Sequence, residues 1–310
     1  MSLSEGFLRD LERTLPVRRD EPLGRYTTFG IGGPADAYVA PDSVDRLTAV
    51  VILCRGSETP FFVLGSGSNI VIGDRGIRGV TIENRAQALS DPAAMENGAP
   101  RYLVRAESGS SFAASARRLA FAGYAGLEWA CGIPGTIGGA VVYNAGAYGG
   151  CLGDVLQRIA VSAGDGLQVI EADDLGLVYR GSAFTRGLMK GKAVLWAEFA
   201  LWPGDAAALK SRVREYDERR LNAQPRGRNA GSIFKNPPEQ PAWKLIDQVG
   251  LRGHRIGGAE FSPKHCNFIV NVEGARAADV AALMALAKAR VRDQFGIELE
   301  AEVSLVGEGF

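Results

Sequence analysis

The sequence predicts an α+β protein with a β-rich middle and a C-terminal domain in which helices alternate with a few strands. Between residues 57 and 202, short apolar or alternating runs are bounded by turn residues, as is typical of strands. At residues 202–205, Trp-Pro-Gly-Asp forms a break followed by a helix-capping residue. Beyond it, residues 206–220 and 275–294 show the spacing of long helices.

The elements follow in order. Residues 1–56 are predicted to form a small α/β lobe, in which Ser43 caps a helix over 44–53 because its hydroxyl can accept a first-turn N–H. In the second part, Gly164-Asp165-Gly166 predicts a hairpin and one helix is expected over 111–121. The strands expected there are 61–64, 80–83, 102–106, 158–162, 169–171 and 193–201. The C-terminal domain is expected to contain a loop over 222–236, helices at 206–220, 243–249 and 275–294, and strands at 267–272 and 298–306.

Composition excludes several functional classes. The chain has 310 residues, 46% of them hydrophobic, with 35 basic and 35 acidic side chains. This balance argues against broad nucleic-acid or membrane-surface binding, and no apolar run is long enough to span a bilayer. No secretory leader is visible after Met1, so a cytoplasmic protein is expected. Four scattered cysteines predict reduced thiols, and two histidines make an imidazole-based metal site improbable, so no metal is expected.

The segment 126–150 is the richest in information. Eight of its twenty-five residues are glycine, yet they are mixed with Ile, Val, Trp and Tyr rather than with linker residues. Glycine in an ordered apolar segment indicates that other backbone or a large ligand comes very close. A second loop, Gly65-Ser66-Gly67-Ser68-Asn69, follows a buried strand and presents N–H groups that suit an anion. Together the two loops predict a phosphate-bearing cofactor laid across a sheet.

Two familiar phosphate motifs are rejected. Residues 30–35, Gly-Ile-Gly-Gly-Pro-Ala, fit G-x-G-x-x-A, but a strand rather than a helix is expected to follow. They are therefore interpreted as a tight turn between strands. No G-x-x-x-x-G-K-[ST] sequence is present, which excludes a P-loop kinase.

Three further segments contain candidate catalytic groups, each with a structural alternative. Arg180, between apolar neighbours, could grip a carboxylate with its fork of N–H donors or lie at a strand end on the surface. Ser232 lies among polar groups before an apolar pair, where a proton relay suits it better than nucleophilic attack. The alternation of Glu298, Glu300 and Glu302 predicts one carboxylate-bearing strand face, for solubility or for acid–base chemistry.

Taken in order, seven segments resemble the UDP-N-acetylenolpyruvoylglucosamine reductase family, the flavoenzymes that make UDP-N-acetylmuramate for peptidoglycan. They run from residue 26 to residue 307, and in sequence order they are 28–35, 64–69, 132–140 with 144–149, 179–184, 231–237, 256–259 with 262–265, and 299–303. The resemblance implies an FAD-binding fold of the vanillyl-alcohol-oxidase (PCMH) kind. Residues 1–56 and 57–204 would be its two lobes, and residues 205–310 a substrate-binding domain.

By the same resemblance, the two loops cradle FAD. The residues so implied are Gly65, Ser66, Gly67, Ser68, Asn69, Gly132, Ile133, Pro134, Gly135, Thr136, Gly138 and Gly139. NADPH would first give hydride to flavin N5 and leave. UDP-N-acetylglucosamine enolpyruvate would then enter the same cleft, receive hydride at its vinyl CH2 carbon, and be protonated at the adjacent carbon.

The resemblance also assigns roles to side chains. Arg180 and Glu302 match the arginine and glutamate of the family, and Ser232 matches its proton donor. Hydride addition pushes charge into the substrate carboxylate, so fixed hydrogen bonds and positive charge must stabilise an enolate-like species. Asn236 and the Lys264–His265 pair are weaker candidates for substrate contacts.

The sequence departs from the family pattern in two places. About 47 residues separate Phe184 from Ser232, which resembles the shorter branch that lacks a tyrosine-bearing loop over the UDP moiety. Ser304 stands where arginine is common. A monomer that binds no nucleic acid is expected. Two other readings stay open at this stage: another FAD-dependent oxidase or dehydrogenase on the same fold, and a non-catalytic interaction module.

Overall fold

The computed structural model describes residues 3–96, 98, 100–164 and 166–310. The chain divides into two units, each assembled from several segments. The first contains Met1–Arg18, Tyr38–Gly65 and Gly79–Arg220, and the second contains Arg19–Ala37, Ser66–Arg78 and Leu221–Phe310. None of the helices in the described residues combines the length and apolar character that crossing a bilayer requires.

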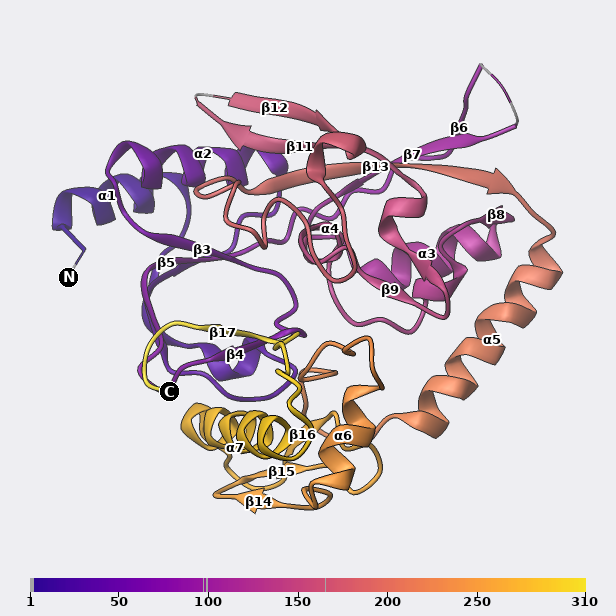
Figure 1. Cartoon of the computed structure of the whole chain (residues 1–310). Helices are drawn as coiled ribbons and strands as arrows, with labels where there is room; N and C mark the ends of the chain where they lie inside the picture. Colours follow the sequence, from indigo (N-terminus) through magenta and orange to yellow (C-terminus); the bar gives the residue numbers. More distant parts are fainter. Residues whose placement is uncertain (1–2, 97, 99, 165) are drawn as a thin grey trace. The chain divides into compact units, whose positions relative to one another are not determined.

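The first unit is built around an antiparallel sheet in the order β12-β11-β13-β7-β6, with β8 paired to β13 (Figure 1). Its strands are β6 (Ala93–Ala94), β7 (Tyr102–Glu107), β8 (Tyr124–Ala125), β11 (Leu156–Ala163), β12 (Gly166–Glu171) and β13 (Val194–Pro203). Ala163 lies opposite Gly166, which confirms the predicted hairpin, although Asp165 itself lies outside the described residues. The long central strand β13 is buried over most of its length because helices cover the sheet.

Helices of this unit start where the sequence places capping residues. Ser43 Oγ accepts the N–H of Arg46 at the start of α2 (Val44–Gly56), and Ser111 Oγ accepts that of Ala114 at the start of α3 (Phe112–Phe121). Helix α2 packs on β11 and β13, α4 (Ile137–Val142) packs on β13 and β7, and α1 (Glu5–Thr14) packs on α2. The buried side chains of α3, α4 and the strands β7, β11 and β13 form one apolar core.

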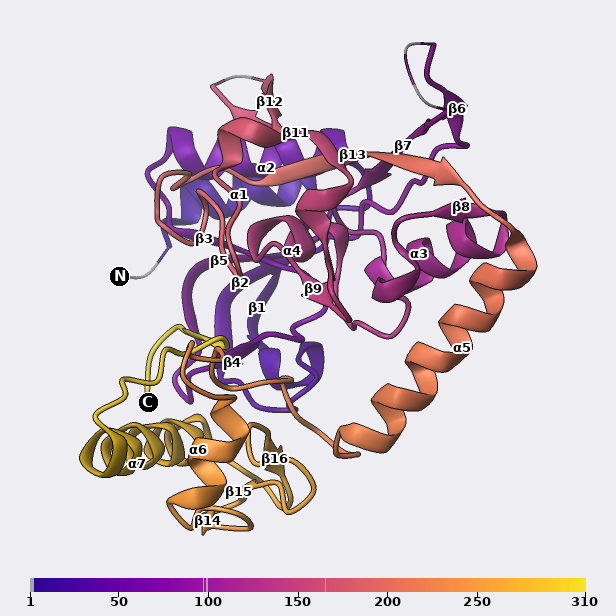
Figure 2. The ribbon, with the colours of Figure 1, turned by 45° about the vertical axis from the view of Figure 1, so that its right-hand side comes forward.

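Helix α5 (Ala206–Ala223) continues three residues beyond the predicted end at residue 220, into the segment expected to be a loop (Figure 2). It starts as predicted, because Asp205 Oδ1 accepts the N–H of Ala208 at 2.7 Å. It ends at Ala223 because Gln224 precedes Pro225, and a residue before proline disfavours helical backbone. The first true helix breaker, rather than the first polar residue, therefore sets the boundary.

The second unit contains a three-stranded sheet in the order β14-β15-β16 with α7 packed on β14 and β15. These elements are β14 (Arg255–Ile256), β15 (Ala259–Phe261), β16 (Ile269–Asn271), α6 (Ala242–Gln248) and α7 (Ala277–Phe295). In addition, β17 (Ser304–Val306) pairs in parallel with β4 (Ile70–Ile72). Phe234, Phe261 and Leu283 are fully buried in the core of this unit.

Two predicted strands are longer than the observed ones. The strand expected over 267–272 is β16, and that expected over 298–306 is only β17. The second strand starts late because the chain changes partner: Ala301 bridges Phe234, whereas Ser304 pairs with Ile70.

The remaining short elements are β1 (Arg18–Pro22), β2 (Pro34–Val39), β3 (Phe61–Leu64), β5 (Ile77–Glu83), β9 (Gly146–Ala147), β10 (Gly150–Cys151) and the 3₁₀ turns η1 (Leu23–Tyr26), η2 (Glu128–Ala130), η3 (Leu152–Asp154) and η4 (Ala172–Leu175).

The turn over residues 30–33 leads into the strand β2, so no helix follows the G-x-G-x-x-A sequence and the rejection of a dinucleotide fingerprint is confirmed. Gly33 N donates to Gly73 O, and a Cβ on Gly33 would lie 2.3 Å from Asp74 O and 2.5 Å from Gly76 N. These are backbone atoms with little freedom to move. Glycine is therefore required at this position for close packing rather than for phosphate binding.

We expect Gly33→Ala to lower the free energy of unfolding by about 3 kcal/mol, because the new methyl group overpacks against backbone. Gly6→Ala is the matched control, since a Cβ there has nothing within 4 Å and lies in α1. It should raise stability by ~0.5 kcal/mol through helix propensity. Urea titration of both variants measures the difference, and equal effects would contradict the close approach.

Candidate active site

The end of β3 and the start of α4 meet within the first unit. A Cβ on Gly65 would lie 2.6 Å from Thr136 Oγ1, so the two predicted cofactor loops touch where a glycine leaves room. Thr136 is the N-cap of α4, and its hydroxyl accepts the N–H of Gly139 at 3.3 Å. The two loops are thus joined by a contact that only glycine at position 65 permits.

The glycines at the start of α4 serve mainly the fold. The N–H groups of Ile137 and Gly138 donate to the carbonyl oxygens of Ser110 and Ser108 at 2.9 and 2.8 Å. A Cβ on Gly138 would lie 3.1 Å from Ser108 Cβ, so this glycine lets α4 approach the residue that directly follows β7. The predicted anion cradle therefore has fewer available donors at its helix end than the glycine count indicates.

The rest of the first loop belongs to the second unit. Gly67 has φ +60°, and a Cβ there would lie 2.3 Å from Tyr26 O, so the loop is pressed against the η1 turn. Gly67 O accepts the N–H of Thr28 at 3.1 Å, while Ser66 remains exposed and Ser68 half-exposed. Asn69 Nδ2 donates to the backbone oxygen of Glu302 at 3.2 Å.

These residues fit FAD. Ser66 is exposed and Ser68 half-exposed, so this small-residue loop presents hydroxyl groups of the kind that bind a diphosphate. The glycines at 65 and 67 make room for Thr136 and Tyr26 of the protein itself.

Arg180 lies in a tight turn of the first unit. Val178 and Gly181 exchange two backbone hydrogen bonds of 3.0 and 3.1 Å, which leaves Tyr179 and Arg180 at the tip. Arg180 has φ +54°, a left-handed conformation that costs a non-glycine residue free energy and is typical of functional sites. Its guanidinium carbon lies 5.5 Å from the centre of the Tyr179 ring.

This turn is attached to α4. The buried Ser182 donates its hydroxyl to Val142 O at 2.6 Å, and Asn144 Nδ2 donates to Val178 O at 3.0 Å. Arg180 is therefore held, through short hydrogen bonds on both sides of its turn, by the helix that begins in the glycine-rich loop. The tip of the turn is exposed at Val178 and Tyr179, so a grip on a carboxylate and a surface arginine at a strand end both remain predictions for Arg180.

Ser232 lies in the second unit beside two fully buried residues, Ile233 and Phe234. The buried side chain of Asn267 accepts the N–H of Phe234 at 3.0 Å and donates to its carbonyl at 2.8 Å. Asn267 O also accepts the N–H of Ile233 at 2.9 Å. Ser232 is itself half-buried, so its hydroxyl lies on a backbone that the core and Asn267 hold in place.

Glu302 lies beside this segment. Its N–H donates to Ile233 O at 2.8 Å, and Ala301 bridges Phe234. The prediction of three glutamates on one strand face is wrong, because residues 298–303 form no regular strand. Glu298 and Glu300 are 71% exposed and pair with Arg292 and Lys235, whereas Glu302 is half-buried. The structure thus brings Ser232 and Glu302 together and separates Glu302 from its neighbours.

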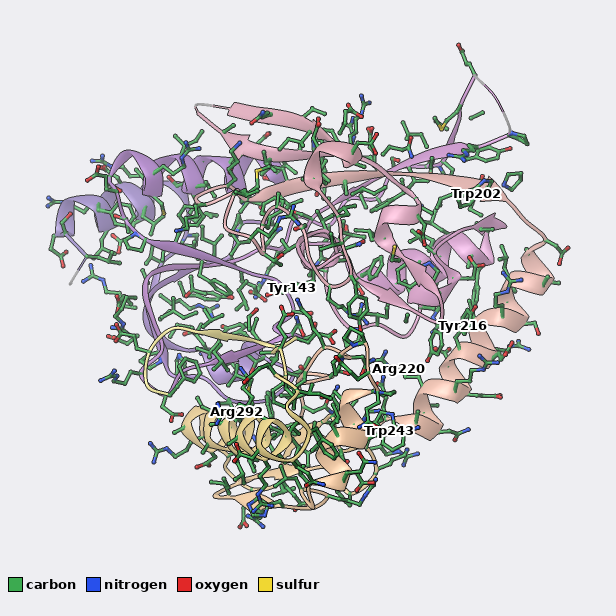
Figure 3. The ribbon with its side chains drawn as sticks, in the orientation of Figure 1. Tyr143, Trp202, Tyr216, Arg220, Trp243 and Arg292 are labelled. Carbon is green, nitrogen blue, oxygen red and sulfur yellow. The ribbon has the colours of Figure 1, made fainter. Side chains whose placement is uncertain are left out.

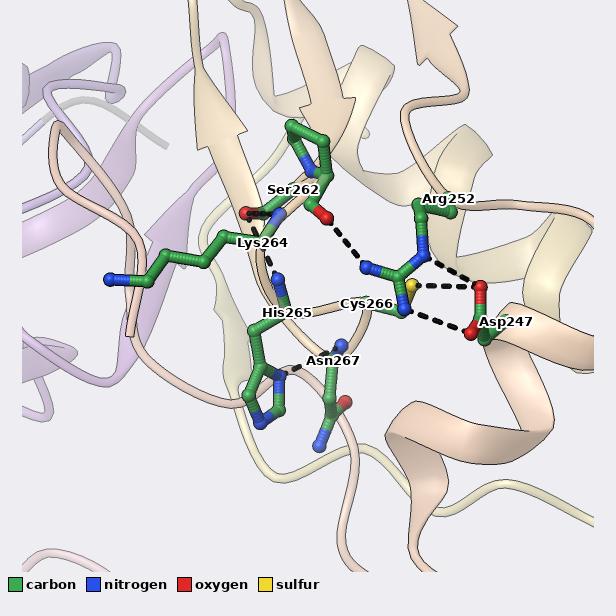
Figure 4. A network of polar contacts seen from close by, with 8 residues as sticks. Asp247, Arg252, Ser262, Lys264, His265, Cys266 and Asn267 are labelled. Atoms are coloured by element: carbon green, nitrogen blue, oxygen red, sulfur yellow. Dashed lines mark hydrogen bonds and ion pairs between the residues drawn. The ribbon is translucent and has the colours of Figure 1, made fainter. Parts of the chain in front are cut away.

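The weaker substrate candidates have contacts within the protein. Asn236 Oδ1 accepts the N–H of Ala242 at the start of α6 at 3.0 Å, and Lys264 Nζ donates to Leu221 O at 2.8 Å. In Figure 4, Ser262 Oγ accepts the N–H groups of Lys264 and His265, which shapes the turn that carries both. Each side chain therefore has a structural role, whatever else it binds.

His265 is largely an aromatic packing residue. Its ring lies 4.9 Å from that of Phe268, edge to face, and its Nδ1 accepts the N–H of Asn267 at 3.3 Å (Figure 4). Burial lowers the pKa of His265 below its usual 6.5. The ring is therefore neutral near pH 7, and its second nitrogen carries the hydrogen.

The same network contains an ion pair that closes the loop after α6. Arg252 donates to both carboxylate oxygens of Asp247 at 2.8 Å, and this hydrogen bonding lowers the pKa of Asp247 (Figure 4). Burial raises the pKa of the neighbouring Cys266 thiol to about 11, so it stays protonated.

Sequence reasoning missed a cluster on α5 that supports the glycine-rich loop of the first unit. The rings of Tyr148 and Tyr216 are stacked with centroids 4.5 Å apart, and Figure 3 labels Tyr216 and Arg220 one turn apart on α5. A Cβ on Gly132 would lie 2.9 Å from Arg220 Cδ, and burial lowers the pKa of Arg220. The four-residue spacing of Tyr216 and Arg220 indicates that both lie on one face of a helix. Their contact with a loop distant in the sequence could not be predicted from that spacing.

Cys131, at the edge of that loop, is buried. Burial raises the pKa of its thiol to about 11, which keeps it protonated and unreactive near neutral pH. The prediction of structural, reduced cysteines agrees with this environment, and all four cysteines are free thiols.

The arrangement of the sheets and loops, together with the family models, defines the class of the protein. An FAD binding domain model matches residues 35–170, and the model for the UDP-N-acetylenolpyruvoylglucosamine reductase C-terminal domain matches residues 223–306. The chain is thus an FAD-dependent oxidoreductase, which confirms the predicted fold of the vanillyl-alcohol-oxidase kind with an added C-terminal domain.

Comparison with individual proteins identifies the family within this class. It is 41% identical over 320 residues to UDP-N-acetylenolpyruvoylglucosamine reductase of Agathobacter rectalis, covering 99% of this chain and 100% of that protein. It is likewise 41% identical to the enzyme of the same name from Rubrobacter xylanophilus, covering 96% and 98%. The crystal structure of the Thermus caldophilus reductase, MurB, superposes with a TM-score of 0.76 at 32% identity, covering 94% and 98%. The chain belongs to the UDP-N-acetylenolpyruvoylglucosamine reductase family and is an NADPH- and FAD-dependent reductase of peptidoglycan precursor synthesis.

The contact between the two loops can be tested with a pair of substitutions. Gly65→Ala should lower the melting temperature of the FAD-free protein and weaken FAD binding, because its methyl group meets Thr136 Oγ1. Adding Thr136→Ala to the Gly65→Ala protein should restore part of the melting temperature and part of the FAD affinity, because the Cβ left at position 136 lies 3.5 Å from the Cβ added at position 65. Thr136→Ala alone controls for the lost helix cap. Calorimetry and flavin fluorescence measure the effects, and no rescue would contradict the contact.

The burial of His265 should make the protein acid-sensitive. Its folded-state pKa lies below the unfolded value near 6.5, so the unfolded state takes up the proton first and stability falls as the pH drops below about 6.5. We expect the free energy of unfolding to fall between pH 7.5 and pH 5.5, where the carboxylates remain ionised. His265→Gln should remove this part of the slope in urea titrations. An unchanged slope would show that other groups cause it.

Proposed function

We propose that this protein reduces UDP-N-acetylglucosamine enolpyruvate to UDP-N-acetylmuramate with NADPH, and that Arg180, Ser232 and Glu302 carry the chemistry. The observation that supports this most is the joining of Ser232 and Glu302 through the backbone of residues 232–234 and 301–302. A proton donor and a carboxylate on two segments joined by backbone hydrogen bonds suit a reaction that must protonate a carbanion-like carbon.

Bound FAD supplies the hydride chemistry, accepting hydride from NADPH and delivering it at flavin N5 to the vinyl carbon of the substrate. The residues proposed to hold it are the predicted set within 65–69 and 132–139. Of these, Ser66 lies exposed at the loop, whereas the N–H groups of Gly138 and Gly139 already donate to protein oxygens. We therefore propose that the 65–69 loop supplies more of the diphosphate contacts than the 137–139 turn.

Ser232 is proposed to protonate the carbon next to the one that receives hydride. A serine hydroxyl is a weak acid, so it transfers a proton only to a strongly basic partner held within hydrogen-bond reach. The core packing of Ile233 and Phe234, with the clamp from Asn267, keeps the Ser232 backbone from moving. That rigidity is what a weak acid needs to act efficiently.

Arg180 and Glu302 are proposed to stabilise the enolate-like charge that develops on the substrate carboxylate. The planar fork of arginine suits a carboxylate. The strained left-handed backbone of Arg180, braced by Ser182 and Asn144, indicates that its direction matters. Glu302 is proposed to act as an acid–base group that assists the developing enol.

Several finer assignments complete the proposal. The chain is proposed to belong to the shorter branch, without a tyrosine loop over the UDP moiety, and to be a monomer. The division into lobes 1–56 and 57–204 and a domain 205–310 remains a prediction, as do substrate contacts from Asn236, Lys264 and His265. NADPH and the sugar nucleotide are proposed to use one cleft in turn.

The test is an anaerobic stopped-flow experiment on the flavin absorbance band. NADPH should bleach the bound flavin, and UDP-N-acetylglucosamine enolpyruvate should restore its colour rapidly. Bleaching without recovery would indicate another acceptor and sink the proposed substrate.

Ser232→Ala should slow the recovery roughly 100-fold or more while leaving bleaching by NADPH nearly unchanged, since general acid catalysis contributes about that much. Ser57→Ala is the control, an exposed serine just after α2 with no assigned role, and it should leave both phases within about twofold. Equal losses in both phases of the Ser232 variant would remove its role as proton donor.

A further inference from the structure

Asn69 makes a contact that its position in the flavin loop does not explain. Its side-chain amide donates to the backbone oxygen of Glu302 at 3.2 Å, 233 residues away in the sequence. Its own backbone oxygen accepts the N–H of Ser304 at 3.0 Å. The two hydrogen bonds grip the segment 302–304 from both sides of Val303, which is buried in the core. Asn69 is half-buried, so solvent competes little for this contact.

Glu302 lies in a stretch that regular secondary structure does not hold. Residues 302 and 303 form bends between the bridge at Ala301 and the start of β17 at Ser304. The Glu302 N–H is held by Ile233 O at 2.8 Å, on the segment that carries Ser232. Its carbonyl is held by the Asn69 side chain. The N–H of Val303 in the same peptide group donates to Ile233 O at a longer 3.4 Å, so the Asn69 amide is the shorter of the two hydrogen bonds that orient this group.

The geometry points to Asn69 as a positioning residue for Glu302. We propose that its amide fixes the peptide group of Glu302, and through it the direction in which the carboxylate leaves the backbone, and that it does so even when no flavin is bound. This inference rests on the proposed role of Glu302, and it goes beyond that role because it assigns to a flavin-loop residue a task in the half-reaction with substrate.

The physical argument is that a glutamate on an irregular segment gains precision only from specific hydrogen bonds. A displacement of about 1 Å in a catalytic group can cost as much as 100-fold in rate. Loss of the hydrogen bond to the part-buried Glu302 carbonyl leaves that acceptor without its side-chain partner, and the peptide group is then held only by the longer bond from the N–H of Val303 to Ile233 O. The expected effect on the substrate half-reaction is therefore substantial but smaller than that of removing the carboxylate itself.

The kinetic test uses flavin-loaded protein in single turnovers, with rates referred to bound flavin so that weakened FAD affinity does not enter. Asn69→Ala should slow recovery of flavin colour by substrate about tenfold, with bleaching by NADPH within about twofold. Asn69→Asp, which keeps the shape but replaces the donor with an acceptor, should slow recovery at least as much and serves if the alanine variant does not fold. Asn271→Ala is the matched control, because Asn271 Nδ2 makes an equivalent bond to Phe29 O at 3.0 Å in the same unit.

A double variant separates positioning from any direct effect on the flavin. If Asn69 acts through Glu302, then Asn69→Ala adds no further slowing to a Glu302→Gln protein. Fully additive slowing would overturn the inference, since Asn69 would then act independently of Glu302. If Glu302→Gln alone recovers at the wild-type rate, the proposed role of Glu302 fails first and the inference falls with it.

A second readout needs no flavin. In FAD-free protein, hydrogen–deuterium exchange should be at least severalfold faster in a peptide covering 300–306 of the Asn69→Ala variant, because the Glu302 carbonyl loses its side-chain partner and the segment opens locally more often. Asn271→Ala should leave that peptide unchanged. Unchanged exchange in the Asn69 variant, with slow recovery by substrate, would show that the residue acts on the flavin and would overturn the inference.

Discussion

The backbone segment Ser232–Phe234 is the constraint on which the second unit depends. Ile233 and Phe234 are fully buried, Asn267 closes a pair of hydrogen bonds on Phe234, and Ala301 and Glu302 attach on the other side. An apolar side chain in the core resists displacement because moving it exposes surface or opens a cavity. The proton donor proposed for the reaction therefore sits on the least movable part of its unit, and Glu302 takes its position from the same segment.

In the first unit, elements are positioned by close packing at glycines, which have no side chain. Gly65, Gly132 and Gly138 each lie where a methyl group would meet Thr136, Arg220 or Ser108. Close backbone approach substitutes for side-chain packing, and the charged face of α5 then braces the outer side. Arg117 pairs with Asp217 at 2.9 Å, and Arg212 pairs with Glu128 at 2.8 Å. A loop rich in glycine is thereby packed closely against its neighbours without bulky side chains.

Arg180 is one of five non-glycine residues with a positive φ among the described residues, and it lies in a turn that glycine would suit better. The left-handed backbone of a non-glycine residue costs of order 1 kcal/mol or more and persists only where neighbours enforce it. Ser182 and Asn144 do so by hydrogen bonds to Val142 and Val178. The three proposed catalytic groups thus lie on three kinds of support: a segment anchored by buried side chains, an irregular segment held by hydrogen bonds, and a tight turn.

Much of this could be predicted from local patterns. Ser43 and Ser111 cap their helices as expected, and the strands at β3, β7 and β13 lie within one or two residues of the predicted runs. Hydrophobic periodicity and capping act over a few residues, so a single chain displays them directly. The prediction of one strand over 298–306 with the glutamates on one face was wrong. The alternation there reflects the exposure of Glu298 and Glu300, while Ala301 and Ser304 pair with different partners.

By itself, the sequence determined most of the elements and the choice of candidate loops and residues, since each depends on residue types close together in the chain. Only the tertiary structure decided which of those residues contact one another. The bond from Asn69 to Glu302 and the clamp of Asn267 on Phe234 join residues far apart in sequence. The N–H groups of Ile137 and Gly138 turned out to serve the fold because Ser110 and Ser108 lie beside them. Hydrogen-bond donors carry no mark of their partner in the sequence, and the partner is set by packing.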